Sequence, residues 1–183
     1  MTLPGKKILF IVNPISGDGR QEKTVSLIKK NLDISRYSYE IIITEMAGHA
    51  TELSKQAAAA GTDIVVAVGG DGTVNEVAQG LVGTDSILGI IPKGSGNGLS
   101  RHLKIPMNLK QAIGIINKGR VVKIDTATLN DDLFVSVAGV GFDASVAKKF
   151  ARAGKRGFLT YFKITAGSYH SYKAKKYILN VDG

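Results

Sequence analysis

The chain has 183 residues, of which 44% are hydrophobic and 21% charged, and a formal net charge of +9. This length and composition allow one complete domain and the start of a second, and they exclude a disordered chain, a collagen and a coiled coil. Cysteine is absent, which excludes disulfides, thiol nucleophiles and cysteine metal sites. The longest aliphatic run, at residues 64–68, is too short to span a membrane, and the first ten residues lack a signal-peptide pattern. We therefore expect a soluble, cytoplasmic protein.

The positive charge is concentrated near the end of the chain. Residues 1–143 hold 15 of the 24 Lys and Arg and 14 of the 15 Asp and Glu, whereas residues 144–183 hold nine basic residues and only Asp182. The two parts therefore carry +1 and +8. This contrast predicts two regions with different roles, the second facing an anionic surface.

Short apolar runs alternate with amphipathic segments over the first two thirds of the chain. In chain order, the patterns predict strands at 7–13, 39–44, 63–68 and 87–91, and helices at 21–32, 49–60, 74–81 and 109–117. This alternation predicts an α/β fold, an open parallel sheet with helices on both faces. Ligands of such sheets bind in the loops beyond the carboxyl ends of the strands.

The pattern changes after residue 120. Two runs at 121–129 and 133–140, joined by a polar turn at 130–132, predict antiparallel strands, followed by helices at 144–152 and 159–172 and a strand at 177–181. The chain ends on Asp182-Gly183, a hairpin-turn dipeptide without a return strand. We expect one domain over 1–127 and the unfinished start of a mainly antiparallel β domain over 128–183. An open sheet edge pairs with a second copy or aggregates, so a homodimer is one expectation.

Three glycine-rich segments follow predicted strands and would share one edge of the sheet. They are NPISG at 13–17, GGDGT at 69–73 and PKGSGNG at 92–98. Each alone is equally well explained as a structural turn, but together their backbone amides and the following helix N-termini suit a polyphosphate. Asp71 among phosphates implies a divalent cation or a proton taken from an acceptor hydroxyl. The GxxxxGK[ST] and GxGxxG patterns are absent, which predicts a phosphate site of another type.

Five motifs follow one another along the chain: NPISG, TEMAGHATELSKQAA at 44–58, GGDGTVNEV at 69–77, PKGSGNGLSR at 92–101 and GVGFDA at 139–144. Their order and spacing resemble those of the diacylglycerol kinase catalytic-domain family. Over essentially its whole length the chain resembles the N-terminal part of this family, which includes bacterial diacylglycerol kinase-like and sphingosine kinase-like lipid kinases. GGDGT is shared with NAD kinases and 6-phosphofructokinases, whereas the NPxSG start and GVGFDA point to the lipid branch.

The resemblance implies a nucleotide-binding kinase domain and assigns roles to individual residues. Asp71 would be catalytic, and Asn97, Arg101 and Asp143 would contact the lipid substrate; the chain is expected to supply no metal ligands. The residues expected to bind the nucleotide are Asn13, Pro14, Ile15, Ser16, Gly17, Thr44, Gly70, Asp71, Gly72, Thr73, Val74, Asn75, Glu76 and Ser95.

Four features bear on this assignment. Ser95 replaces the usual threonine and keeps its hydroxyl, whereas Gly98 replaces the usual aspartate and removes a carboxylate. Asp143 is equally well explained as the N-cap of a helix starting at Ala144. In the family, a second domain supplies structural magnesium ligands and a late acidic residue thought to be the general base, and this chain stops before either.

We therefore expect an ATP-dependent lipid kinase that uses Mg²⁺ and transfers the γ-phosphate to a lipid hydroxyl such as that of diacylglycerol. The alternatives are an NAD kinase or other soluble-metabolite kinase, and a nucleotide-binding module without catalysis.

The basic segment near the end of the chain also carries aromatic and apolar residues. Five cations at 148–156 precede Phe158, Leu159, Tyr161 and Phe162, a combination that suits peripheral contact with an anionic membrane, although a solvated helix with its aromatics in the core explains it equally well. His49, His102 and His170 lack metal-site spacing, and we treat them as structural. No nucleic-acid-binding motif is present, so nucleic acid is not an expected partner.

Overall fold

A computed structural model describes residues 5–17, 21–153, 158–178 and 180–181. The chain forms two compact units, Met1–Val137 and Ala138–Gly183. The expected domain division after residue 127 stays a prediction.

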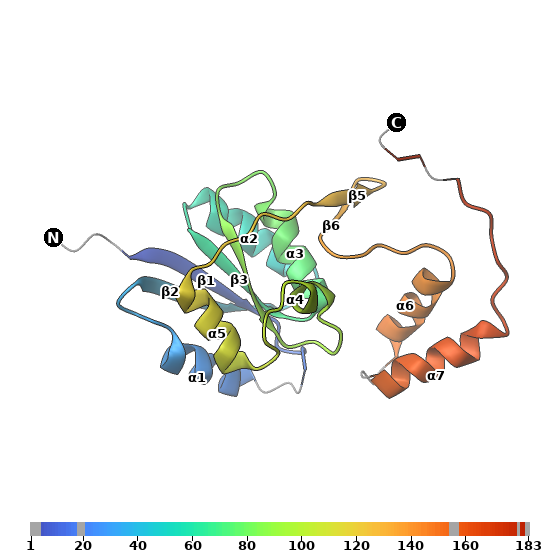
Figure 1. Cartoon of the computed structure of the whole chain (residues 1–183), viewed down its shortest axis with the longest axis horizontal. Helices are drawn as coiled ribbons and strands as arrows, with labels where there is room; N and C mark the ends of the chain where they lie inside the picture. Colours follow the sequence, from blue (N-terminus) through green and yellow to red (C-terminus); the bar gives the residue numbers. More distant parts are fainter. Residues whose placement is uncertain (1–4, 18–20, 154–157, 179, 182–183) are drawn as a thin grey trace. The chain divides into compact units, whose positions relative to one another are not determined.

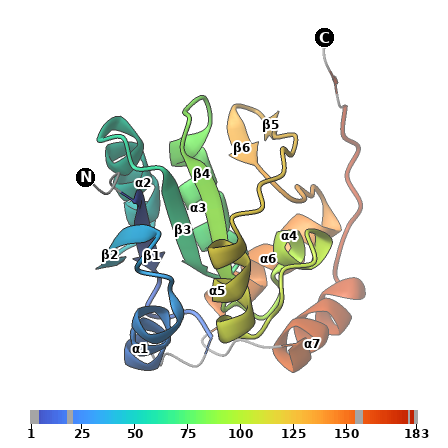
Figure 2. The ribbon, with the colours of Figure 1, turned by 60° about the vertical axis from the view of Figure 1, so that its left-hand side comes forward.

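The first unit is built around a four-stranded parallel sheet in the order β2-β1-β3-β4 (Figures 1 and 2). Its strands are β1 (Lys6–Val12), β2 (Tyr37–Ile43), β3 (Ile64–Gly69) and β4 (Ile87–Pro92). The helices that follow them are α1 (Gln21–Asn31), α2 (His49–Ala59), α3 (Asp71–Leu81), α4 (Gly98–His102) and α5 (Leu109–Lys118). The predicted open parallel α/β fold is confirmed.

Helices cover both faces of the sheet and create two hydrophobic cores. On one face, Phe10 packs with Ile28 of α1 and Ile113 of α5, whereas on the other, Ile11 packs with Val77 of α3. Neighbouring residues of one strand enter different cores because side chains alternate across a strand. A strand buried on both faces needs a continuous apolar run, and this explains the unbroken hydrophobic pattern of β1 and β3.

Two helices of this unit begin at positions the sequence patterns did not predict. Helix α3 starts at Asp71 rather than at residue 74, because Gly70 is its N-cap and the DGT residues form its first turn. The short helix α4 follows Asn97 and was not predicted, since five residues are too few to show a helical period.

A short hairpin follows α5. Strands β5 (Ala127–Leu129) and β6 (Asp132–Phe134) pair antiparallel, with Leu129 opposite Asp132. Asn130 and Asp131 both have positive φ, 49° and 71°, as a two-residue type I′ hairpin turn requires. The hairpin is confirmed, but the predicted strands at 121–129 and 133–140 were too long. Residues 121–126 pair with no strand among the described residues, so their apolar side chains, such as Val122, stay exposed.

The second unit contains two helices, α6 (Phe142–Arg152) and α7 (Phe158–Tyr169). They pack through the edge-to-face contact of Phe150 with Tyr161 at 5.6 Å and the hydrogen bond that Lys149 Nζ donates to Ser168 Oγ at 2.9 Å. Helix α6 begins at Phe142 after Gly141, a residue with φ 78°, so Asp143 lies in its first turn and is not the N-cap.

The strand predicted at 177–181 was wrong for the residues that the structure describes there. Residues 173–178 have no regular secondary structure, and residues 180–181 form no strand. Ile178 is 93% exposed, and a short apolar run is stable as a strand only when a neighbouring strand pairs with it. Residue 179 and the Asp182-Gly183 turn lie outside the described residues. In neither unit is a described helix long and apolar enough to cross a membrane.

Candidate functional site

The three glycine-rich segments meet at the carboxyl edge of the sheet. The register pairs Val12 with Val68 and Val68 with Ile91, so β1, β3 and β4 end level with one another. Thr44 comes to the same edge after β2, where its N–H donates to the carbonyl of Val12 at 2.9 Å. The parallel topology thus assembles the site from segments far apart in the sequence.

The first and second loops are joined by side-chain hydrogen bonds. Asn13 Nδ2 donates to Thr73 Oγ1 at 3.0 Å, while Asn13 Oδ1 accepts from the N–H of Ile15 at 3.1 Å. One amide therefore fixes both its own loop and the start of α3. Ser16 and Thr73, both expected to bind nucleotide, are buried.

The second loop presents the N-terminus of α3. Gly70 occupies the N-cap in an extended conformation, and no side chain caps this helix. The first intrahelical bond runs from Val74 N–H to the carbonyl of Gly70 at 3.1 Å, which leaves the preceding amides to other partners. A helix N-terminus of this kind carries partial positive charge and favours an anion. Gly72 lies in its first turn, and a Cβ on it would meet no atom within 4 Å.

Asp71 ties the second loop to the third. Its Oδ2 accepts from the N–H of Asn97 at 2.8 Å and its Oδ1 from the N–H of Gly98 at 2.7 Å. The carboxylate therefore stabilises the start of α4. A carboxylate oxygen has two lone pairs, so each oxygen keeps one acceptor position after these bonds.

The third loop is held by Asn97 and Arg101. The Asn97 side chain accepts from the N–H of Gly94 at 2.9 Å and donates to its carbonyl at 2.6 Å, and Asn97 has a left-handed φ of 57°. Arg101 Nε donates to the carbonyl of Gly96 at 2.9 Å. Both residues were predicted to contact substrate, and in this structure their described hydrogen bonds shape the loop.

Close packing of the second and third loops depends on glycine. A Cβ on Gly94 would lie 2.5 Å from the Cα of Gly70, closer than side-chain carbons approach backbone. At Gly98, where the related family has aspartate, a Cβ would lie 3.3 Å from Ser136 Oγ and 3.7 Å from Asp71 Oδ1. Any side chain at this position would therefore lie beside the carboxylate of Asp71.

Of the remaining predicted site residues, some lie at the carboxyl edge of the sheet and others lie in the core, against the hairpin or in the second unit. Ser95 is exposed on the third loop. Val74 is 4% exposed inside the core, so only its backbone faces the edge, and Asn75 Nδ2 donates to the carbonyl of Leu133 of the hairpin at 3.1 Å. Asp143 belongs to α6 of the second unit.

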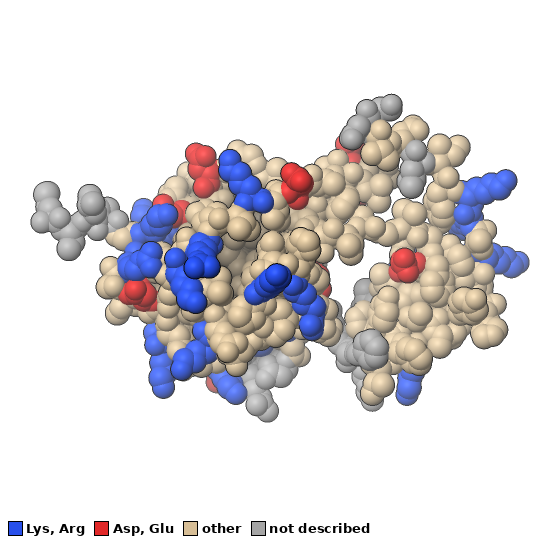
Figure 3. Space-filling model, viewed as in Figure 1, with Lys and Arg blue, Asp and Glu red and all other residues tan. Residues whose placement is uncertain are grey.

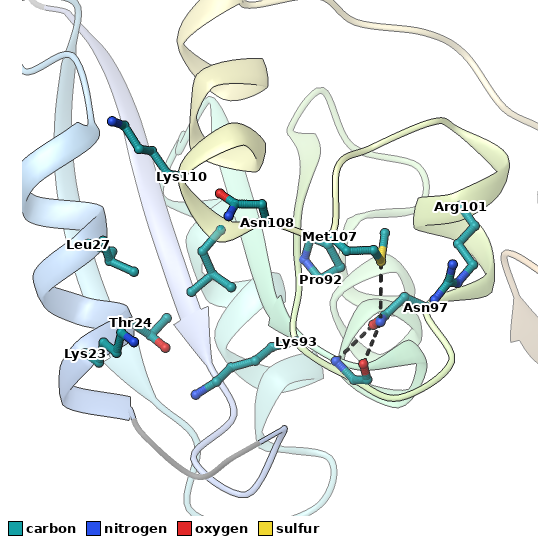
Figure 4. Close-up of a pocket in the computed structure, with 12 residues that line it drawn as sticks. Lys23, Thr24, Leu27, Pro92, Lys93, Asn97, Arg101, Met107, Asn108 and Lys110 are labelled. Carbon is teal, nitrogen blue, oxygen red and sulfur yellow. Dashed lines mark hydrogen bonds between the residues drawn. The ribbon is translucent and has the colours of Figure 1, made fainter. Parts of the chain in front are cut away.

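A cavity of about 610 Å³ adjoins the third loop on the side of α1 and α5 (Figure 4). Its wall includes Lys23, Lys93 and Lys110, which the sequence analysis did not single out. Lys93 lies within the PKGSGNG segment itself, so this motif could have drawn attention to it, whereas Lys23 and Lys110 are ordinary helix positions in the sequence.

An open parallel sheet whose glycine loops and helix N-termini gather at the carboxyl edge defines an α/β domain suited to phosphorylated ligands. Comparison with known proteins is more specific. The sequence profile of the diacylglycerol kinase catalytic domain matches residues 7–129, and the chain belongs to that family.

Several relatives match over most of this chain. An uncharacterized protein of Synechocystis sp. is 38% identical over 86% of this chain and 39% of its own length. The diacylglycerol kinase of Bacillus subtilis is 37% identical over 74% of this chain and 46% of its own length. A crystal structure of a diacylglycerol kinase from Bacillus anthracis str. Sterne aligns with a TM-score of 0.63 at 32% identity, covering 70% of this chain and 48% of that one. The chain spans less than half the length of these relatives.

Proposed function

We propose that this chain carries the nucleotide-binding part of an ATP-dependent lipid kinase, which transfers the γ-phosphate of Mg-ATP to a lipid hydroxyl such as that of diacylglycerol. The observation that supports it best is the uncapped N-terminus of α3 between two glycine-rich loops. Membership of the family favours a lipid acceptor over a soluble metabolite.

In this proposal the loops position the nucleotide and neutralise its charge. Phosphoryl transfer needs little covalent chemistry from the protein and depends mainly on positioning and electrostatic stabilisation. The amides at the start of α3 would bind phosphate oxygens, with the Asn13–Gly17 segment and Thr44 beside them. The O–P bond to ADP breaks as the acceptor oxygen bonds to the γ-phosphorus. Asp71, the one carboxylate in the three loops, would accept the hydroxyl proton.

Magnesium enters the proposal with the substrate. Among the described residues, no three His, Asp or Glu side chains gather into a group that could hold a metal ion. These residues do not fit a protein-built metal cage. The ion would therefore be bound by the phosphates of ATP.

The second unit would bring the kinase to its acceptor at the cytoplasmic membrane surface. On α7, Leu159 and Phe162 are 75% and 61% exposed and could enter an interface. Not all of the predicted basic and aromatic residues are available, because Lys149 bonds Ser168 and Tyr161 packs on Phe150. Lys155 and Arg156 lie outside the described residues.

The first test measures how much Mg-ATP stabilises the chain against unfolding, and the second measures phosphate transfer to lipid. We expect Mg-ATP at a hundred times its dissociation constant to stabilise the chain by about 2.7 kcal/mol, and NAD to have no comparable effect. Gly72→Leu should abolish this stabilisation, because its side chain would project into the space where a phosphate would bind without striking the protein. Gly114→Leu on α5 is the matched control, since it too opens on empty space.

Transfer is measured with γ-labelled ATP and diacylglycerol in mixed vesicles. Equal Mg-ATP stabilisation of the Gly72→Leu variant and the unmodified chain would refute the nucleotide site. Stabilisation by Mg-ATP without labelled lipid would refute catalysis by this chain and leave a binding module.

A further inference from the structure

The cavity beside the third loop is distinct from the proposed nucleotide site. Its wall is formed by the first turns of α1, by the chain from Pro92 to Gly94, and by the start of α5, and it includes Asn97 and Arg101. None of the residues expected to bind nucleotide lines it. Helices α1 and α5 cover the face of the sheet opposite to α3, so the cavity opens on the other side of the third loop. We call it the α1–α5 pocket.

The α1–α5 pocket is strongly basic. Four of its lining residues are cationic, namely Lys23, Lys93, Arg101 and Lys110, and none of its described lining residues is Asp or Glu. By contrast, residues 1–137 as a whole are nearly neutral, with 15 Lys and Arg against 13 Asp and Glu. Figure 3 shows Lys and Arg side chains gathered on the face of the first unit that carries α1 and α5. The α1–α5 pocket is therefore much more positively charged than the first unit as a whole.

The positions of Lys23 and Lys110 are not explained by stabilisation of the helices that carry them. Lys23 is the third residue of α1 and Lys110 the second of α5, and both are exposed. A cation in the first turn is opposed by the partial positive charge of the helix N-terminus. An anion bound in the pocket would attract both lysines and both helix N-termini, and would therefore offset the repulsion between them.

The packing of its side-chain stem directs Lys93 toward the α1–α5 pocket. The stem of Lys93 lies against Gly17, where a Cβ would come 3.0 Å from Lys93 Cγ. Gly17 also has a φ of 69°, a conformation that glycine adopts without strain. Figure 4 shows Lys93 extending from the loop after β4 toward Lys23 and Thr24 of α1.

The rest of the wall is apolar. Leu27, Pro92, Met107 and Leu109 line the cavity between the charged side chains. A volume of about 610 Å³ is within the range of small-molecule sites, which combine apolar walls with a few placed polar groups. The wall therefore suits a ligand with an anionic group and a compact uncharged body.

We propose that the α1–α5 pocket binds a phosphate-bearing compound as a second anion site, separate from the nucleotide site. Phosphate matches the cations because Lys and Arg form charge-assisted hydrogen bonds with its several oxygens. The phosphate could belong to a free small molecule or to a lipid headgroup. The inference does not depend on kinase activity.

The test is a calorimetric titration of the full chain with inorganic pyrophosphate, in which every chain, the otherwise unmodified one included, carries Gly72→Leu so that the proposed nucleotide site does not bind the probe. The pocket variant is Lys23→Gln with Lys110→Gln, and the control is Lys29→Gln with Lys118→Gln, which removes the same charge from the last turns of the same helices, outside the pocket wall. We expect pyrophosphate to bind the pocket variant about tenfold more weakly and the control within about twofold of the unmodified chain.

Three results would overturn the proposal: no pyrophosphate binding by the unmodified chain at millimolar concentration, unchanged binding by the pocket variant, or equal weakening in both variants. A second arm uses vesicles of phosphatidylcholine with phosphatidic acid. Weaker vesicle binding by the pocket variant alone identifies a headgroup phosphate, and unchanged vesicle binding identifies a free phosphate compound. The Gly72→Leu test of the nucleotide site uses Mg-ATP and can fail independently.

Discussion

Substitution of Gly94 by alanine tests the contact between the second and third loops. The added Cβ would lie 2.5 Å from the Cα of Gly70 and 3.0 Å from Asn97 Oδ1. The first neighbour is backbone, so the loops must separate rather than a side chain rotate. Overpacking of this kind costs about 1–3 kcal/mol. The lower entropy of alanine in the unfolded chain offsets about 0.4–1 kcal/mol.

We therefore expect Gly94→Ala to destabilise the chain by about 1–2 kcal/mol and to lower its melting temperature by about 2–8 °C. The assay is thermal unfolding by circular dichroism, with urea unfolding to obtain the free energy. Gly114→Ala is the control. It lies in the middle of α5 with no atom within 4 Å of its Cβ, so the same chemical change should stabilise by up to about 1 kcal/mol. Equal stability of Gly94→Ala and the unmodified chain would refute the close approach of the two loops.

Three further substitutions test the roles assigned above. Asp71→Ala removes both acceptors at the start of α4; we expect a loss of about 1–3 kcal/mol in urea unfolding and no labelled-phosphate transfer, and full transfer activity would contradict its catalytic role. Asn97→Ala loses the paired bonds to Gly94 and places alanine at a left-handed φ, so about 2 kcal/mol of destabilisation is expected by the same measurement, whereas Asn97→Gly should recover part of it. Leu159→Gln with Phe162→Gln should weaken sedimentation with anionic vesicles without lowering stability, while Ile34→Gln, equally exposed in the first unit, should leave sedimentation unchanged. Equal sedimentation of all these chains would rule out α7 as the membrane contact.

The sequence predicted the sheet well because β1 and β3 are buried on both faces. Their uninterrupted apolar runs, each followed by glycine or proline, leave few alternatives to a parallel α/β arrangement. It predicted the convergence of the three loops for the same reason, since parallel strands end on one edge.

Other features depend on contacts that no local pattern encodes. The strand expected at 177–181 is mostly apolar, but Ile178 is 93% exposed and pairs with no strand in the described structure. Asp71 was read as a group among phosphates, whereas the structure also bonds it to amides 26 and 27 residues away. The lysines of the α1–α5 pocket lie far apart in sequence, and only the packing of α1 beside α5 brings them to one cavity.

The bonds between the loops have a consequence for the order of folding. Asn13 and Thr73, which join the first and second loops, are 60 residues apart, and the third loop, which Asp71 bonds, directly follows β4, the strand that pairs with β3. Parallel strands and distant partners form slowly, because the entropy of closing the intervening chain must be met before the contact is made. A nascent chain therefore acquires the site only after residue 98 has emerged and three strands have aligned. Recovery of ligand binding during refolding should accordingly follow the slowest phase of sheet formation, behind the appearance of helical structure.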